Sequence, residues 1–162
     1  SHRSGYDFLI QGMGGLMSIT GQPDGSPGGG PMKVGVAVCD LFTGMFAANA
    51  ALAALAYRSR TGIGQHIDCA LLDSQISMLA NQSANWLNAE ICPDRMGNSH
   101  PSVVPYTVYE AKDGFVIIAC GNDKQFIRLT AALGIPALAD DDDFASNEAR
   151  IKNRDRLDAM LG

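Results

Sequence analysis

A long apolar stretch, LFTGMFAANAALAALAY from Leu41 to Tyr57, constrains the fold of this chain more than any other segment. Its apolar side chains fall on every side of a helix, so a helix formed here must be covered all round. A membrane span needs about 20 strongly apolar residues, whereas this stretch is rich in alanine and is interrupted by Thr43, Gly44 and Asn49. The sequence therefore predicts a buried helix from about Leu41 to Arg60 and no membrane segment.

The composition is that of a globular protein, because 46% of the 162 residues are hydrophobic and 18% are charged. This length allows one ordinary domain or two small lobes. The formal net charge of -5 leaves no excess of Lys and Arg for phosphate groups, which argues against a nucleic-acid partner. The opening SHRSGYDFLI has no basic region followed by an apolar one. We therefore expect no signal peptide and a cytoplasmic location.

The cysteines and the acidic residues do not indicate a metal site. No two cysteines form a C-x-x-C pair, and no histidine stands at a ligand spacing from them. They are expected to be free thiols in a reducing compartment: Cys39, Cys69, Cys92 and Cys120. The acids at 140–143 are predicted to form a solvated loop, because consecutive acids cannot all face one ion.

The segments around the long helix indicate their secondary structure less strongly. Residues 5–35 are rich in glycine, and the stretch QPDGSPGGGP at 22–31 predicts an exposed irregular loop. The stretch at 5–21 has neither a preceding strand nor the G-x-G-x-x-G order of a dinucleotide site. Residues 65–72, QHIDCALL, are rich in strand formers and predict a strand. Asp73 is then expected to cap a second helix. The prolines and small polar residues of 93–105 predict a loop between two lobes.

The last part of the chain has the pattern of a hairpin followed by helices. Residues 106–110, YTVYE, and 115–120, FVIIAC, flank the tight-turn sequence Lys112-Asp113-Gly114. We expect an antiparallel hairpin there. The predicted caps of the two helices that follow are Asn122 or Asp123, and Ser146.

Asp40, in KVGVAVCDLFTGM, is the residue whose position most needs an explanation. A carboxylate between apolar segments is costly to bury unless something compensates. The N-terminus of a helix does so, because its free N–H groups and its dipole favour an anion. Asp40 is therefore either an ordinary helix cap or a nucleophile held at the cap position, and the residue types alone leave both open.

Four segments of the chain resemble the central block of the class III (CaiB/BaiF-type) CoA-transferases. They are GYDFLIQGMGGLMSITG, VGVAVCDLFTGM, RTGIGQHIDCALLDSQISMLANQ and RMGNSHPSVVPYTVYEAKDGFVIIACGNDKQF, which together span most of the chain. The resemblance implies an α/β fold in three parts. Residues 1–92 would be the end of a large Rossmann-like domain (helix-strand-helix), 93–105 an inter-lobe loop, and 106–162 an incomplete small α+β domain with the hairpin. The chain would then be a central fragment, inactive by itself.

The resemblance also implies an activity, that of an acyl-CoA:carboxylate CoA-transferase with coenzyme A thioesters as substrates and no metal. Asp40 would attack the acyl-CoA and form an aspartyl-CoA thioester, from which a small carboxylic acid acceptor reverses the steps. A loop of Gly97, Asn98, Ser99 and His100 would close over the acyl group. Gly97 would supply flexible backbone and N–H groups, and His100 either orients a substrate carboxylate or is an ordinary surface histidine. This loop has a single glycine where some relatives have several.

Two other functions stay open at this point. The same family includes acyl-CoA racemases, and the chain could instead be a non-catalytic binding or assembly module in which Asp40 is only a cap. The resemblance further implies an interlocked homodimer, located in the cytoplasm or, in a eukaryote, in the mitochondrion. Most contacts to CoA are expected upstream of this chain, and the donor and acceptor acids are not indicated by it.

Overall fold

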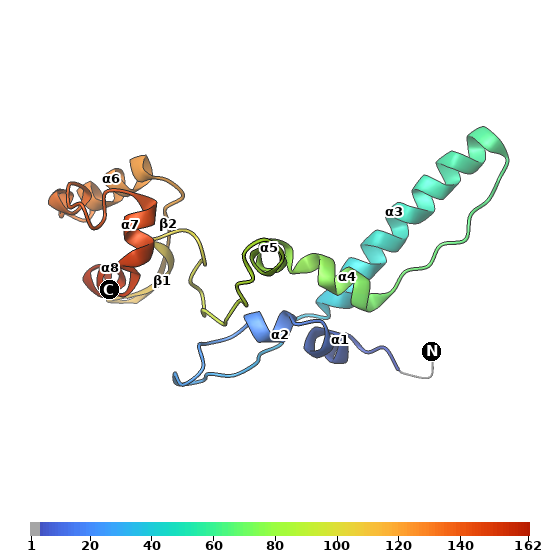
Figure 1. The fold of residues 1–162 in the computed structure, drawn as a ribbon, viewed down its shortest axis with the longest axis horizontal. Helices are drawn as coiled ribbons and strands as arrows, with labels where there is room; N and C mark the ends of the chain where they lie inside the picture. The colour runs from blue at the N-terminus through green and yellow to red at the C-terminus, as the bar shows by residue number, and fades with distance from the viewer. Residues whose placement is uncertain (1–3) are drawn as a thin grey trace. The chain divides into compact units, whose positions relative to one another are not determined.

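Figure 1 shows the chain as a computed structural model, which describes residues 4–162 and divides into two compact units after Gly97. The described first unit covers 4–97 and the second unit 98–162. Residues 1–3, which begin the predicted 1–92 segment, lie outside the described residues. The division falls inside the loop predicted at 93–105, while the assignment of the units to lobes of a larger enzyme stays a prediction.

The first unit consists of helices joined by long irregular segments. The glycine-rich segment between the second and third helices is irregular, as predicted, and is closed by an isolated bridge between Gln22 and Gly29. The first, third and fourth helices contact one another near the start of the third (Figure 1). The helices are α1 (Asp7–Met13), α2 (Leu16–Ile19), α3 (Val38–Thr61), α4 (Leu71–Met78) and α5 (Ala80–Ala89).

The long helix α3 forms as predicted, but the prediction that it is buried on all sides is wrong for the described residues. Only 6% of its most apolar stretch is buried. Figure 1 shows the reason, since α3 extends well past the other helices of its unit and only its first turns have neighbours. By length and composition alone, α3 is also long and apolar enough to cross a membrane. Its large exposed side chains include Leu41, Phe42, Met45, Phe46, Leu52 and Leu55.

The strand predicted at 65–72 is wrong. Residues 63–70 are irregular, and α4 begins at Leu71 with Ala70 as its N-cap, so Asp73 lies in the first turn instead of capping the helix. Strand-forming side chains are not sufficient, because a strand needs a neighbour that pairs its backbone groups. No described residue pairs with this segment. The predicted second helix is also divided into α4 and α5, because Ala80 has a φ of 47°.

The second unit contains the predicted antiparallel hairpin. β1 (Tyr106–Ala111) pairs with β2 (Gly114–Ala119), and Ala111 lies opposite Gly114 across the turn formed by residues 112–113. Gly114 has a φ of 158°, a backbone conformation that residues other than glycine rarely adopt. The mixed α/β class with an antiparallel hairpin is therefore confirmed.

The helices of the second unit follow the hairpin and enclose its core. The predicted caps are confirmed, because the side chain of Asn122 accepts from the N–H of Gln125 and that of Ser146 from the N–H of Ala149. The elements are α6 (Asp123–Ala132), a 3-10 turn (Pro136–Ala139), α7 (Asn147–Lys152) and α8 (Arg154–Leu161). The core contains Val104, Cys120, Phe126, Leu138, Phe144 and Leu157.

Candidate functional site

Asp40 lies in the first turn of α3 and not at its N-cap. The helix begins at Val38, and its N-cap is Ala37, which has no side chain that can cap. The prediction that Asp40 caps the helix is therefore wrong by almost one turn. The carboxylate of Asp40 is exposed and accepts no hydrogen bond from any residue of 4–162, so within the described chain it is free to meet a substrate.

The cap of α3 comes from another helix. Asp7, in the first turn of α1, accepts a hydrogen bond of 2.8 Å from the N–H of Cys39 through its Oδ1. One of the otherwise unpaired N–H groups of α3 is thus satisfied by a carboxylate far away in the sequence. Because Asp7 fills this role, Asp40 does not have to turn back onto its own helix.

Gln11 holds Asp7 and the approach to Asp40 together. It is fully buried, one helical turn after Asp7, and its Nε2 donates to Asp7 Oδ2 at 2.7 Å. Its Oε1 accepts from the N–H of Val34 at 2.9 Å, and its Nε2 also reaches the carbonyl of Val36 at 3.4 Å. Sequence reasoning missed Asp7 and Gln11. The signal was present as two polar residues at i and i+4 in an otherwise apolar helix, which places them on one face.

The neighbouring thiol of Cys39 is held inactive. Its side chain is fully buried. Burial, followed by the nearby carboxylate of Asp7, raises the pKa of Cys39 from 9.0 to about 11. The thiolate is the reactive form of cysteine, so Cys39 stays protonated at neutral pH. Of the two adjacent candidate nucleophiles, Cys39 is buried and Asp40 is exposed.

The predicted substrate loop is divided between the two units. Gly97 ends the first unit, where its φ of 60° favours glycine, and a Cβ at this position would lie 2.9 Å from the side chain of Gln22. Its N–H donates to the carbonyl of Gly21. Asn98 begins the second unit and is exposed. The Oγ of Ser99 donates to the hydroxyl of Thr107 in β1 at 3.2 Å.

His100 is fixed from several directions in the second unit. Its N–H donates to the carbonyl of Tyr106, and its ring lies 5.1 Å from the ring of Tyr106. Its Nδ1 accepts from the N–H of Ser102 at 3.0 Å. A ring nitrogen that accepts carries no proton, so the neutral ring bears its proton on Nε2. This half-buried histidine thus has one N–H left to donate.

Ion pairs account for part of the acidic run. Asp143 lies 2.6 Å from Arg156, and Asp141 lies 3.9 Å from the same guanidinium, with all of these side chains about half exposed. Within residues 4–162, no group of three or more His, Cys, Asp or Glu side chains is arranged to hold a metal ion. The acids of 140–143 form the solvated loop that their spacing predicts.

Comparison with known proteins shows long matches to one family. The chain matches the model of CoA-transferase family III over residues 1–162. It is 53% identical over 151 residues to a succinate–glutarate CoA-transferase of Agrobacterium fabrum, covering 93% of this chain and 37% of that protein. It is 44% identical over 161 residues to a succinyl-CoA:glutarate CoA-transferase of Mus musculus, covering 99% of this chain and 36% of that protein.

Solved structures that resemble this chain include a member of the same family. A crystal structure of a CaiB/BaiF family protein from Brucella suis is 52% identical, with a TM-score of 0.77, covering 98% of this chain and 41% of that one. A Mycobacterium tuberculosis protein is 28% identical with a TM-score of 0.82, and the match covers 98% of this chain and 40% of that one. The chain spans well under half the length of these relatives. With the family model matched along its whole length, the chain belongs to CoA-transferase family III.

Proposed function

We propose that the protein containing this chain is an acyl-CoA:carboxylate CoA-transferase in which Asp40 is the covalent nucleophile. The observation that carries the proposal is the free, exposed carboxylate of Asp40 in the first turn of α3, whose cap is supplied by Asp7. The positive end of a helix favours an anion at that place. An exposed and unpaired carboxylate is what nucleophilic attack on a thioester requires.

The chemistry is a double exchange at one carboxylate. An oxygen of Asp40 attacks the thioester carbonyl, the C–S bond breaks, and CoA leaves as thiolate, so that Asp40 and the donor acyl group are joined as a mixed anhydride. The thiolate then attacks the aspartyl carbonyl, which releases the donor acid as its carboxylate and leaves an aspartyl-CoA thioester. The acceptor carboxylate repeats these steps in reverse order, so Asp40 is regenerated and no proton or redox partner is consumed.

The acids exchanged are proposed to be small dicarboxylic acids. The relatives named above act on succinate and glutarate, and a relative from Acetobacter aceti, 38% identical over 161 residues, is an acetyl-CoA:oxalate CoA-transferase. A dicarboxylic acid has a second carboxylate that stays ionised during the transfer.

Trapping of the intermediate tests the proposal. The full-length protein is incubated with succinyl-CoA and hydroxylamine, and the peptide containing Asp40 is examined by mass spectrometry. We expect an aspartyl hydroxamate at Asp40, which is lost in Asp40→Ala. Absence of the adduct with every acyl-CoA tried would favour a non-catalytic module. Exchange of the α-hydrogen of a 2-methylacyl-CoA in D2O, without transfer to an acid, would instead favour a racemase.

A further inference from the structure

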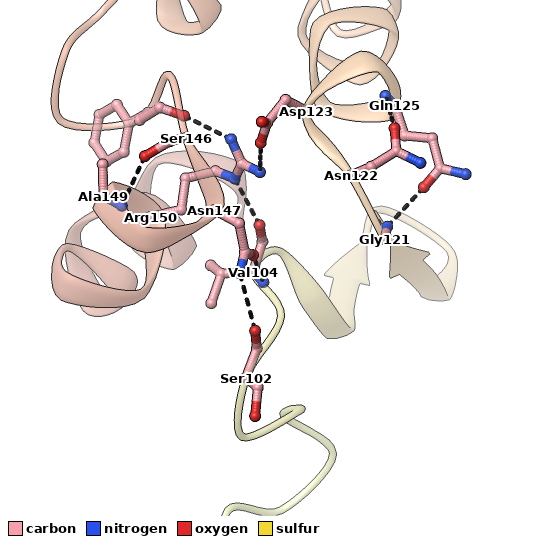
Figure 2. Close-up of polar contacts among 11 residues, drawn as sticks. Ser102, Val104, Gly121, Asn122, Asp123, Gln125, Ser146, Asn147, Ala149 and Arg150 are labelled. Atoms are coloured by element: carbon pink, nitrogen blue, oxygen red, sulfur yellow. Dashed lines mark hydrogen bonds and ion pairs between the residues drawn. The ribbon is translucent and has the colours of Figure 1, made fainter.

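The third residue of α6 shows what a polar side chain can do at that position of a helix. This residue is Gln125, and its Oε1 accepts from the N–H of Gly121, before the helix, at 2.6 Å (Figure 2). Asn122 caps the same helix by accepting from the N–H of Gln125 at 3.0 Å. The side chain of Gln125 is therefore engaged in satisfying the backbone next to the N-terminus of its own helix.

Asp40 has the same third position in α3, which begins at Val38. A carboxylate there can fold back as well, because the first N–H groups of a helix have no partner inside it and attract an anion. The N–H groups of Ala37 and of Asp40 itself donate to no residue of 4–162. Donors for a self-capping Asp40 are thus available, yet within the described residues its carboxylate is exposed and unpaired.

Asp7 is the feature of α3 that has no counterpart in α6. Its Oδ1 accepts from the N–H of Cys39 at 2.8 Å, and Gln11 donates to its other oxygen at 2.7 Å. A negative charge is therefore fixed at the N-terminus of α3, where a carboxylate of Asp40 that folded back would also lie. Burial raises the pKa of the Cys39 thiol most, and Asp7 and Asp40 both raise it further, so both carboxylates act on this residue. Two like charges at one place repel each other.

We propose that Asp7 is a positioning residue that keeps Asp40 reactive by excluding it from the cap of its own helix. While Asp7 caps α3, the carboxylate of Asp40 is free to attack a thioester. Without Asp7, the carboxylate of Asp40 turns back and is held by the N–H groups of the first turn. The inference rests on the proposed function, since it concerns the same nucleophile, but the capping itself is measurable without turnover.

Hydrogen exchange of residues 37–41 in the full-length protein measures this capping. We compare Asp40→Ala in the wild-type background and in the Asp7→Ala background. Asp40 is the expected cap in Asp7→Ala, so removing it there should speed up exchange about fivefold more than in wild type, as for the loss of one helix cap. Equal effects of Asp40→Ala in the two backgrounds would overturn the inference.

Asp7→Asn provides the same comparison if Asp7→Ala does not fold. The amide keeps an acceptor for the N–H of Cys39 and removes only the charge. Exchange of residues 37–41 should again depend on Asp40 in this background, because the repulsion that excludes its carboxylate is gone. Independence from Asp40 here would likewise contradict the role of Asp7.

Trapping with hydroxylamine provides a second measurement. At saturating succinyl-CoA, Asp7→Ala should form the hydroxamate at Asp40 about fivefold more slowly with an unchanged KM, because only the free fraction of Asp40 reacts. The control is Asp73→Ala, which removes an exposed acid from the same third position of α4. Asp73 accepts no hydrogen bond from residues 4–162, so its removal should keep the wild-type rate.

A higher KM with an unchanged rate in Asp7→Ala, or an equal loss of rate in Asp73→Ala, would contradict the positioning role. Failure of the proposed function is seen separately, as the absence of a hydroxamate at Asp40 in the wild-type protein. The exchange comparison still decides in that case whether Asp7 and Asp40 compete for the N-terminus of α3.

Discussion

Moving the negative charge from position 7 to position 11 tests whether the N-terminus of α3 is capped as the contacts indicate. In the wild-type chain, Asp7 accepts from Cys39 and from Gln11, so both of its oxygens are needed as acceptors. In Asp7→Asn, only one oxygen remains. The new NH2 group must face either the N–H of Cys39 or the Nε2 of Gln11, and both of these are donors.

The expected cost of Asp7→Asn is that of one unpaired buried donor, about 1–3 kcal/mol. Rotating the amide of Gln11 does not relieve it, because its Nε2 would then face the N–H of Val34. Adding Gln11→Glu does relieve it. The new carboxylate accepts from the amide at position 7 with one oxygen and from Val34 with the other, so these two hydrogen bonds are restored with the charge moved by one helical turn. Only the longer contact of Gln11 Nε2 to the carbonyl of Val36, at 3.4 Å, is lost.

The assay is the midpoint of thermal unfolding of the full-length protein, together with the rate of hydroxamate formation at Asp40. Asp7→Asn should lower both, and Asp7→Asn/Gln11→Glu should recover stability to within about 1 kcal/mol of wild type, as expected for coupled neighbours. Gln11→Glu alone places two carboxylates together and should be the least stable variant at neutral pH. A double variant less stable than Asp7→Asn would refute this account of the cap.

Further predictions follow from packing and exposure. A methyl group at Gly14 would overlap Oε1 of the fully buried Gln75, so Gly14→Ala should cost about 1–3 kcal/mol in thermal unfolding and Gln75→Ala should rescue it. At pH 8, alkylation followed by mass spectrometry should modify the exposed Cys69 and Cys92 but not Cys39. Because the pKa of Cys39 is raised, its contribution to stability is present below pH 9.0 and is lost as the pH approaches about 11; equal labelling at pH 8 would contradict this. The isolated chain should self-associate through the exposed apolar surface of α3, and a monomer in light scattering at high concentration would contradict that.

Features set by neighbouring residues could be predicted from the sequence. The hairpin follows from two strand-forming runs around a short turn, and the caps Asn122 and Ser146 act on N–H groups only three residues away. The extent of α3 follows from its composition and from Gly62, whose φ of 74° ends the helix. In each case the signal and the structure that it specifies lie within one turn of the chain.

Features that depend on distant partners were missed. The cap of α3 comes from Asp7, which is 32 positions before the N–H that it binds. The strand expected at 65–72 had suitable side chains, but no described segment lies alongside to pair with it. Arg154 gives no local sign that it binds the carbonyl of His100, which is 54 positions away. Such contacts depend on the tertiary fold, which residue propensity and hydrophobic periodicity do not predict.

The two candidate site residues, Asp40 and His100, lie in separate units, and in each unit side chains from distant parts of the sequence hold the backbone around them. Backbone groups around each residue are satisfied by side chains from elsewhere: Asp7 and Gln11 for Asp40, and Asn147, Arg150 and Arg154 for His100. The carboxylate of Asp40 and the Nε2 of His100 have no hydrogen-bond partner among the described residues, while the backbone near each is held. A free atom on a fixed backbone loses little conformational freedom when a substrate binds, which is how a site lowers the entropic cost of orientation. Substitutions at Asp7 and Gln11 should therefore weaken the proposed function without touching the carboxylate of Asp40.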